Sequence, residues 1–275
     1  MDNYQTIWAE FEGPIATLWL ARPEVHNALN NKMIHEISSF FSQLEEVKEV
    51  RFVVIRGQGR SFCSGADLQW MKSAFMLSKE ENLKESEELS RMFSIIFHSS
   101  KIVIAVVHGN VFGGGNGLVA VCDLAFGLSN ARFSLSETRI GMAAATITPY
   151  LLMKIRTKDL KELIFSARSF NGDEAVKYGL MNHSFSSSET LDYYLSGLLI
   201  QMEANGREAI VASKQLINRL TIQSMSEAME HIPGLLAQIR VSPEAQEGFS
   251  AFLEKRKTNW HISDEAGFGH EEHIQ

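Results

Sequence analysis

The chain has 275 residues, of which 45% are hydrophobic and 21% charged, as is ordinary for a soluble enzyme or binding protein with one large domain or a core with an appendage. Its formal net charge of -7 argues against a general binder of nucleic acid or anionic membranes, and leaves only a local basic patch for a phosphorylated ligand. The two cysteines, Cys63 and Cys122, lie in or beside apolar runs, so we expect packed, reduced thiols and neither a disulfide framework nor a metal site. The first residues, MDNYQTIWAE, show no signal or transit pattern, and no apolar run approaches the ~20 residues of a membrane span, so we expect a cytoplasmic protein without membrane contact.

The first half of the chain alternates between extended and helical patterns. A hairpin is predicted over residues 6–21, where two alternating runs flank the turn EGP. The run IVIAVV has no polar alternation, which is typical of a strand buried on both faces. The other elements predicted here are strands at 51–57, 101–109 and 123–135 and helices at 22–47 and 79–98. Strands that alternate with helices indicate an α/β core with largely parallel pairing.

The pattern after Thr146 is almost wholly helical. Many of these segments lack a polar face wide enough for a solitary surface helix, so we expect packed helices that also bury surface against other subunits. The predicted helices are 172–180, 191–205, 207–220, 226–240 and 242–257.

The stretch VFGGGNGLVAVCD places bare backbone between a strand and a helix-like run. No Gly-Lys-Ser/Thr follows, which excludes a phosphate loop. A dinucleotide fingerprint can be drawn through Gly115, Gly117 and Ala120 with Glu137 as its acidic residue, but the first glycine lies seven residues beyond Val107 instead of in the turn after the strand. Helix packing and an oxyanion hole are the other two readings.

A second stretch, SFCSGADL, resembles the first in its chemistry. It puts the small residues Ser64, Gly65 and Ala66 between a strand and a helix expected to start at Asp67, so backbone amides are again left unbonded. Two such donor sites would suit the oxyanion of a thioester.

Five motifs in order resemble the enoyl-CoA hydratase/isomerase (crotonase) family. They are SFCSGADL, IAVVHGNVFGGGNGLVAVCDLAF, ARFSLSETRIG, SARSFNGDEAVKYGLMN and GFSAFLEKRKTNW, and the resemblance runs from RPEVHNALN to FLEKRK. Within the family, the chain looks most like bacterial hydratases of branched acyl-CoA degradation, such as methylglutaconyl-CoA hydratase. The resemblance implies a spiral of β-β-α turns (residues 1–195) followed by a helical region (196–275) that packs trimers, or hexamers formed by two trimers.

The resemblance also assigns roles. The backbone amides of Ala66 and Gly114 would hold the thioester oxygen, with Gly113 and Gly115 allowing the approach, and Glu137 would transfer protons at the α carbon. The family's first glutamate is absent, because Gly117 stands at its position, and Asn116 offers at most an amide that orients a water.

The missing glutamate keeps several functions open. Hydration of an enoyl-CoA with Glu137 alone is the preferred interpretation. Double-bond isomerisation by the same carboxylate, a catalytically silent acyl-CoA binder and a dinucleotide oxidoreductase are the alternatives.

Coenzyme A is expected only as part of the substrate, with no metal or redox cofactor. Its phosphates need local cations, for which Arg22 and His26 are candidates, together with Phe252 and Lys255 reaching the adenine and phosphate of a neighbouring subunit. The remaining predicted contact residues are Ser64, Gly65, Asp67, Leu68, Gly113, Asn116 and Gly117.

Overall fold

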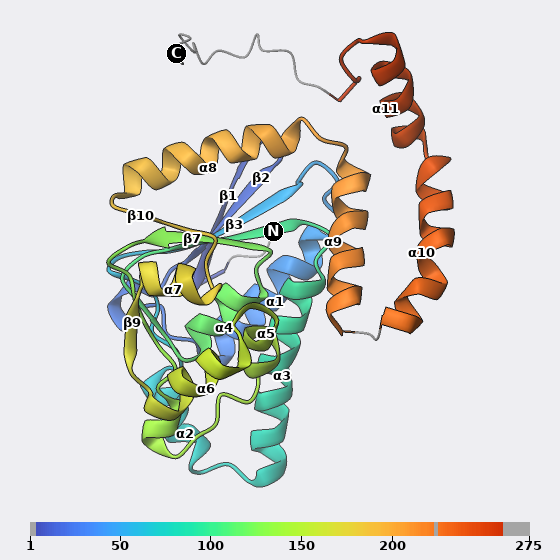
Figure 1. The fold of residues 1–275 in the computed structure, drawn as a ribbon. Helices are drawn as coiled ribbons and strands as arrows, with labels where there is room; N and C mark the ends of the chain where they lie inside the picture. Colours follow the sequence, from blue (N-terminus) through green and yellow to red (C-terminus); the bar gives the residue numbers. More distant parts are fainter. Residues whose placement is uncertain (1–3, 223–224, 261–275) are drawn as a thin grey trace. The chain divides into compact units, whose positions relative to one another are not determined.

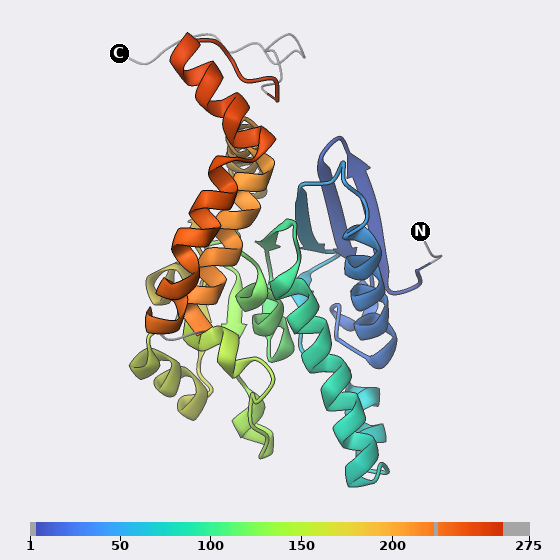
Figure 2. The ribbon, with the colours of Figure 1, turned by 90° about the vertical axis from the view of Figure 1, so that its right-hand side faces the viewer.

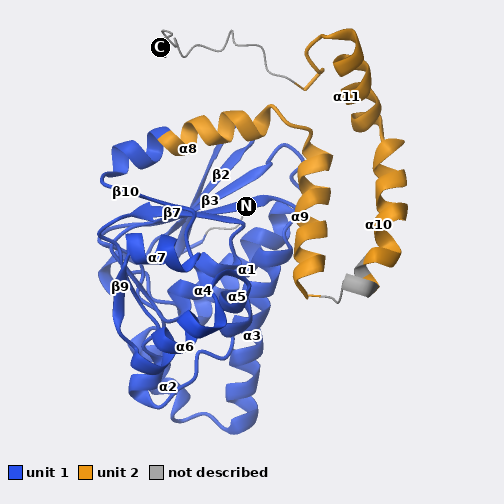
Figure 3. Cartoon of the chain, in the orientation of Figure 1, with its two compact units in different colours: residues 1–193 blue, residues 194–275 orange. Residues whose placement is uncertain are grey.

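Two β-sheets and the helices around them form the first of two compact units into which the chain divides, residues 1–193 and 194–275 (Figure 3). The structure is a computed structural model and describes residues 4–222 and 225–260. The larger sheet has the strand order β1-β2-β3-β5-β7-β10 and the smaller one β4-β6-β8-β9 (Figure 1). Neighbouring strands are parallel, except for the pairs β1–β2 and β8–β9.

The strands are β1 (Ile7–Glu12), β2 (Ile15–Leu20), β3 (Phe52–Gly57), β4 (Ser61–Cys63), β5 (Ile102–Val107), β6 (Asn110–Phe112), β7 (Leu124–Leu128), β8 (Arg132–Ser134), β9 (Ser169–Asn171) and β10 (His183–Phe185). In the first unit the helices are α1 (Asn31–Leu44), α2 (Leu68–Ala74), α3 (Lys79–His98), α4 (Gly114–Val121), α5 (Thr148–Lys154), α6 (Thr157–Ser166) and α7 (Gly172–Tyr178), with 3-10 helices η1 (Pro23–Val25) and η2 (Glu137–Ile140). α8 (Ser188–Glu203) crosses the boundary between the units, and α9 (Arg207–Ile222), α10 (Met225–Arg240) and α11 (Pro243–Glu254) follow.

The chain alternates between the two sheets. Strands β3, β5 and β7 of the larger sheet are each followed, after a short turn, by β4, β6 and β8 of the smaller one, and helices lead to the next pair. Gly109 makes one of these turns with φ +58, and a Cβ on it would lie 1.9 Å from the carbonyl oxygen of Arg60. This confirms the expected spiral of β-β-α turns.

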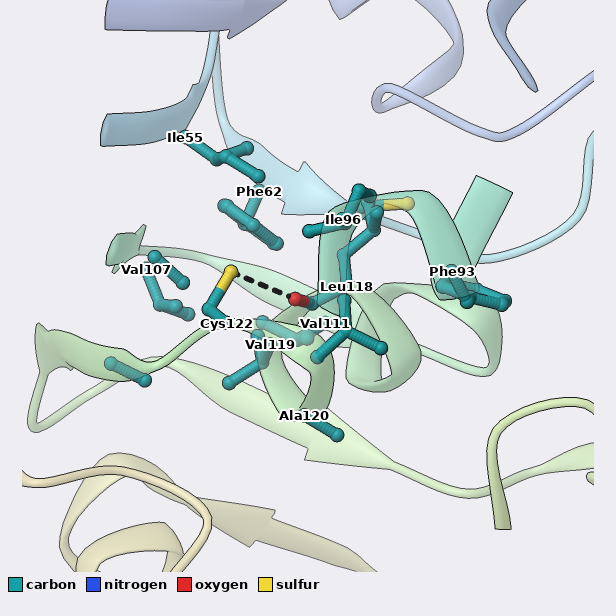
Figure 4. Close-up of a cluster of buried hydrophobic side chains, with 14 of the residues drawn as sticks. Ile55, Phe62, Phe93, Ile96, Val107, Val111, Leu118, Val119, Ala120 and Cys122 are labelled. Atoms are coloured by element: carbon teal, nitrogen blue, oxygen red, sulfur yellow. Dashed lines mark hydrogen bonds between the residues drawn. The ribbon is translucent and has the colours of Figure 1, made fainter. Parts of the chain in front are cut away.

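The core lies between the larger sheet and the helices α1, α3 and α4. α1 and α3 pack side by side (Figure 2), and β5 is buried along its whole length, as its unbroken apolar run predicts. Leu118 and Val119 of α4 meet Phe93 and Ile96 of α3 in one buried cluster (Figure 4).

Two sequence predictions in this unit were wrong. The helix expected over 22–47 begins only at Asn31, because His26 and Asn27 take left-handed backbone angles and the Asn30 side chain caps the helix by accepting the Met33 N–H. The strand expected over 123–135 is two strands, β7 and β8, in different sheets.

The second unit is helical. The carboxylate of Glu244, in the first turn of α11, accepts hydrogen bonds from the backbone amides of Glu208 and Ala209 at the start of α9, both at 2.9 Å. α11 ends at Glu254, earlier than the predicted 257, since Lys255 adopts a left-handed φ of 53. Across the described ranges, no helix combines the length and apolar character needed to cross a bilayer.

Candidate active site

Three loops leave the carboxyl ends of the neighbouring parallel strands β4, β6 and β8. They are residues 64–67, 113–114 and 135–137. Because parallel strands direct their carboxyl ends to the same edge of a sheet, the topology brings these loops together. All three residues predicted to be catalytic lie in them.

The first loop presents the backbone amide of Ala66. Leu29 pairs with Ala66 as in a parallel ladder: the Leu29 N–H donates to the Gly65 carbonyl at 2.7 Å, and the Asp67 N–H donates to the Leu29 carbonyl at 2.8 Å. This alternation turns the Ala66 N–H to the other side, where it meets no acceptor among the described residues. Ala66 itself is exposed, so its amide can reach a ligand.

The second loop presents the amide of Gly114, the first residue of α4. Its N–H lacks an acceptor in the described part of the chain, as is usual for a helix start. The preceding Gly113 has φ 47 and ψ -120, and its own N–H donates to the Ser134 carbonyl at 3.1 Å. The buried Asn116 side chain donates to the carbonyls of Val111, Gly113 and Ser134 at 3.2, 3.3 and 2.9 Å, so its amide nitrogen braces this loop, while its Oδ1 has no hydrogen-bond partner among the described residues.

The distances from an ideal Cβ atom placed on a glycine show how closely the three loops approach one another. A Cβ built on Gly113 would lie 3.8 Å from the Cα of Gly65 and 3.3 Å from Oε1 of Glu137. The same construction on Gly65, whose φ is +92, meets the Phe112 carbonyl oxygen at 2.9 Å. The structure therefore brings the Gly65–Ala66 and Gly113–Gly114 backbones and the Glu137 carboxylate to one place.

Glu137 opens the 3-10 helix η2, which neighbouring bonds fix. The Thr138 hydroxyl donates to the Ile164 carbonyl at 2.9 Å, and Arg139 donates to the Ala167 carbonyl at 2.7 Å. Oε2 of Glu137 is buried and has no hydrogen-bond partner among the residues described. Burial raises the pKa of this carboxyl, and the hydrogen bond from its own backbone amide offsets the shift only in part. A raised pKa favours the protonated form of a carboxyl group, which is the form that can donate a proton.

The residues predicted to bind coenzyme A in the first unit form a bonded group. Arg22 donates to the Ala28 carbonyl at 2.6 Å and to Asp67 at 2.7 Å, and Asp67 caps α2 through the amides of Gln69 and Trp70. Burial works against the charged form of Asp67, but these hydrogen bonds lower its pKa overall. Arg22 thus braces the loop that carries Ala66, and part of its guanidinium is already engaged.

His26 and the outer side of the same loop are more accessible. The exposed His26 ring shares a hydrogen bond of 3.0 Å with the Ser61 hydroxyl, and the Ser64 N–H donates to the His26 carbonyl at 3.0 Å. Leu68 is 75% exposed at the start of α2. The segment that carries the Ala66 amide therefore has accessible neighbours on both sides, His26 and Leu68.

Gly115 and Gly117 lie inside α4, where they serve packing. A Cβ on Gly115 would lie 2.4 Å from the Cys63 carbonyl oxygen, and one on Gly117 would collide with the side chains of Ile147 and Phe93. This contradicts the dinucleotide reading, which needs these glycines in the turn directly after a strand. No group of three His, Cys, Asp or Glu side chains in the described ranges is arranged to hold a metal ion.

Phe252 and Lys255 belong to the second unit, in and just after α11. Phe252 is 82% exposed. Arg256, which follows Lys255, donates to Glu247 at 2.7 Å and to Glu254 at 2.8 Å. Its guanidinium is therefore already paired with carboxylates at the end of the helix.

Sequence reasoning missed that Leu29 and Phe93 lie beside the site residues. Leu29 pairs with Ala66, and its Cδ1 would lie 3.0 Å from a Cβ on Gly114. Phe93 and Ile147 fill the space beside Gly117. The local patterns of Leu29 and Phe93 indicate only buried apolar residues. For Ile147 the sequence does carry a signal, because it lies in the run GMAAATITPY, where many relatives have a Pro-Gly-rich turn and where added Cβ atoms are expected to narrow the pocket wall beside Glu137.

Comparisons with known proteins show which family the chain resembles. The family model of enoyl-CoA hydratase/isomerase matches residues 10–263. A crotonyl-CoA hydratase of Syntrophomonas wolfei is 30% identical over 94% of this chain and 98% of its own, and a mitochondrial Delta(3,5)-Delta(2,4)-dienoyl-CoA isomerase of Mus musculus is 27% identical over 93% and 82%.

Among solved structures, an enoyl-CoA hydratase/isomerase from Marinobacter aquaeolei superposes with a TM-score of 0.88 at 30% identity, covering 94% of this chain and 99% of that one. The family match spans nearly the whole chain. The loops after β4, β6 and β8 bring together Ala66, Gly114 and Glu137, which lie in three of the sequence motifs. The chain is therefore an enzyme of the enoyl-CoA hydratase/isomerase, or crotonase, family.

Proposed function

We propose that this enzyme adds water reversibly across the α,β double bond of an enoyl-CoA thioester. The observation that carries the proposal is the convergence of two unbonded backbone amides, those of Ala66 and Gly114, with the carboxylate of Glu137. The relatives named as hydratases support the same chemistry.

The two amides supply the oxyanion hole. The thioester oxygen accepts from both, and gains negative charge as the enolate forms. The positive end of α4 adds to the stabilisation at Gly114. Each donor is expected to contribute roughly 3 kcal/mol to the transition state.

Glu137 handles both protons. The protonated carboxyl gives its proton to the α carbon, while the oxygen of a water molecule bonds to the β carbon. The proton released by that water goes to the other carboxyl oxygen, so the group ends as it began. Burial raises the pKa of Glu137, which favours the protonated form that gives its proton to the α carbon.

The finer details of the substrate follow from the family resemblance. We infer a branched acyl group of the methylglutaconyl type, held through coenzyme A with no resident cofactor. The thioester and pantetheine parts are proposed to contact residues in or beside the Ala66 loop. These are Arg22, His26, Ser64, Asp67 and Leu68.

Assembly into trimers, or into hexamers of two trimers, is part of the same proposal. In such an assembly Phe252 and Lys255 would reach the nucleotide bound by a neighbouring subunit. Their exposed position at the end of α11 is compatible with this role.

Isomerisation of the double bond is the second candidate. It is favoured by the apolar side chains beside Gly117, since moving one proton between two carbons of an enolate needs only one carboxylate. The relatives named dienoyl-CoA isomerases add weight to it.

A product assay tests both candidates. Enoyl-CoA thioesters, including 3-methylglutaconyl-CoA, are incubated with the wild-type enzyme and with Glu137→Gln. Hydration lowers the enoyl absorbance and yields a 3-hydroxyacyl-CoA, whereas isomerisation yields a thioester of unchanged mass. Equal turnover by both proteins would remove Glu137 from its role, and binding without turnover would leave an acyl-CoA binder.

A further inference from the structure

Gly117 lies in α4, three residues after Gly114, whose amide is part of the proposed oxyanion hole, and it stands where the family resemblance places the first glutamate. A Cβ built on Gly117 would lie 2.3 Å from Cγ2 of Ile147 and 2.8 and 3.0 Å from the Phe93 ring carbons Cζ and Cε1. Real Cβ atoms essentially never approach another heavy atom below 3.0 Å. No side chain fits at residue 117 without moving these neighbours.

Neither neighbour is placed to move. Phe93 is 0% exposed and packs against the Tyr150 ring at a centroid distance of 6.3 Å, and Figure 4 shows it in the buried cluster with Ile96 and Leu118. Ile147 is 1% exposed, and its carbonyl accepts the Leu151 N–H of α5 at 3.0 Å. Its Cγ2 sits on the branched β carbon, so no rotation about a distant bond can withdraw it.

We propose that Ile147 and Phe93 are positioning residues that restrict this site to a single carboxylate. By filling the space beside Gly117 with apolar atoms, they exclude both a second acid and a bound water from that side. Glu137 then performs both proton transfers. This proposal rests on the function proposed above and names the residues that impose its one-carboxylate form.

The packing half of the proposal is tested by thermal unfolding of Gly117→Ala, Ile147→Ala and the double variant. Gly117→Ala is expected to lower Tm by about 5 °C, since overpacking a full core is costly. In the Ile147→Ala background the same alanine should cost less, because the closest contact, with Cγ2 at 2.3 Å, is gone and only those with the Phe93 ring at 2.8 and 3.0 Å remain. Gly197→Ala in α8 is the matched control: nothing lies within 4 Å of its Cβ position, so its Tm should not fall. An unchanged Tm for Gly117→Ala would overturn the proposal.

The chemical half is tested by the pH dependence of kcat/KM for hydration. The wild-type profile should show one ionisation, which Glu137→Gln abolishes. Gly117→Glu together with Ile147→Ala should show two ionisations and hydrate at least ten times faster than Gly117→Glu alone. Gly117→Glu with Ile104→Ala is the control, because Ile104 is buried in β5 on the face opposite its core neighbours Val103 and Ala105; it should behave as Gly117→Glu does.

The possible failures are distinguishable. A wild-type enzyme that hydrates with two ionisations overturns this proposal and leaves the hydratase function standing. Rescue by Ile104→Ala as complete as by Ile147→Ala would also overturn it. A wild-type enzyme that hydrates no enoyl thioester instead overturns the proposed function, and the Tm cycle still decides whether Ile147 closes the space at residue 117.

Discussion

Two carboxylates in this fold have pKa values shifted in opposite directions, although burial acts to raise both. Glu137 has one oxygen without a partner among the described residues, and burial raises its pKa. Burial also acts to raise the pKa of Glu36, but there the Thr6 hydroxyl and the amides of Gln5 and Thr6 outweigh it, and the pKa is lowered. Polar partners, more than depth, therefore decide which carboxylate is suited to proton transfer and which to anchoring the chain.

Glu137→Gln is predicted to inactivate the enzyme and to stabilise it. The folded protein retains this proton above the unfolded pKa of about 4.3, so its stability falls as pH rises through the interval up to the raised folded pKa. Glutamine cannot ionise and avoids that loss. We expect a higher Tm at pH 7, convergence with wild type below about pH 4, and a loss of about 10³-fold in kcat/KM. A lower Tm at pH 7 would contradict the burial argument.

Glu36→Gln is the matched substitution and should behave in the opposite way. Glu36 accepts the Thr6 N–H at 2.8 Å and the Thr6 hydroxyl at 2.5 Å, tying the start of the chain to α1. Because the folded pKa is lowered, this stability is present above pH ~4.3 and is lost as pH falls through the folded value. We expect a loss of about 2 kcal/mol at pH 7, little change at low pH, and unchanged kcat/KM. Urea unfolding at several pH values measures it.

At the scale of elements, the start of α4 depends on a backbone shape that only glycine adopts easily. Gly113 combines φ 47 with ψ -120, and a Cβ there would press on Oε1 of Glu137 at 3.3 Å. The start of α4 and the Glu137 carboxylate are thus in close contact, so a substitution at Gly113 should displace the carboxylate.

Gly113→Ala is predicted to lower kcat/KM by about 10²-fold, because it displaces both the Gly114 amide and Glu137. Gly13→Ala provides the control for backbone strain, since Gly13 has φ +52 but nothing within 4 Å of its Cβ position, in the turn between β1 and β2. Both variants should lose stability, which thermal unfolding measures, and only Gly113→Ala should lose activity. Comparable activity in the two would show that the contact with Glu137 is unimportant.

Elements whose signals are local were predicted well from the sequence. The helix at 79–98 has the predicted bounds, with Ser78 capping it and Met92, Phe93 and Ile96 on its buried face. Residues 22–30 have apolar residues at helical spacing, yet they pair with the Ala66 loop across a long sequence separation. The local sequence pattern carries no information about such a contact, and it therefore predicts a helix that starts too early, at residue 22 instead of Asn31.

At the scale of the whole molecule, the sequence motifs predicted which backbone amides and which carboxylate come together at the site. The strand ends bring Ala66, Gly114 and Glu137 together, and the parallel order of β4, β6 and β8 explains why. The filling of the space at residue 117 could not be predicted, because Phe93 and Ile147 arrive there from α3 and from the start of α5. Only the packed core shows that the glycine at the family's acid position leaves no room for a side chain.

Phe252 and Lys255 allow the second unit to be tested separately from the chemistry. If their exposed end of α11 holds the nucleotide part of coenzyme A, Phe252→Ala and Lys255→Ala should each raise KM for an enoyl-CoA about 5-fold and leave kcat unchanged. Arg256→Ala is the control, because Glu247 and Glu254 already engage that guanidinium; its KM should stay at the wild-type value. The same enoyl group on N-acetylcysteamine lacks adenine and phosphates, so all four proteins should convert it equally. A matching loss on this short thioester would mean that α11 supports the fold of the site and does not bind the nucleotide.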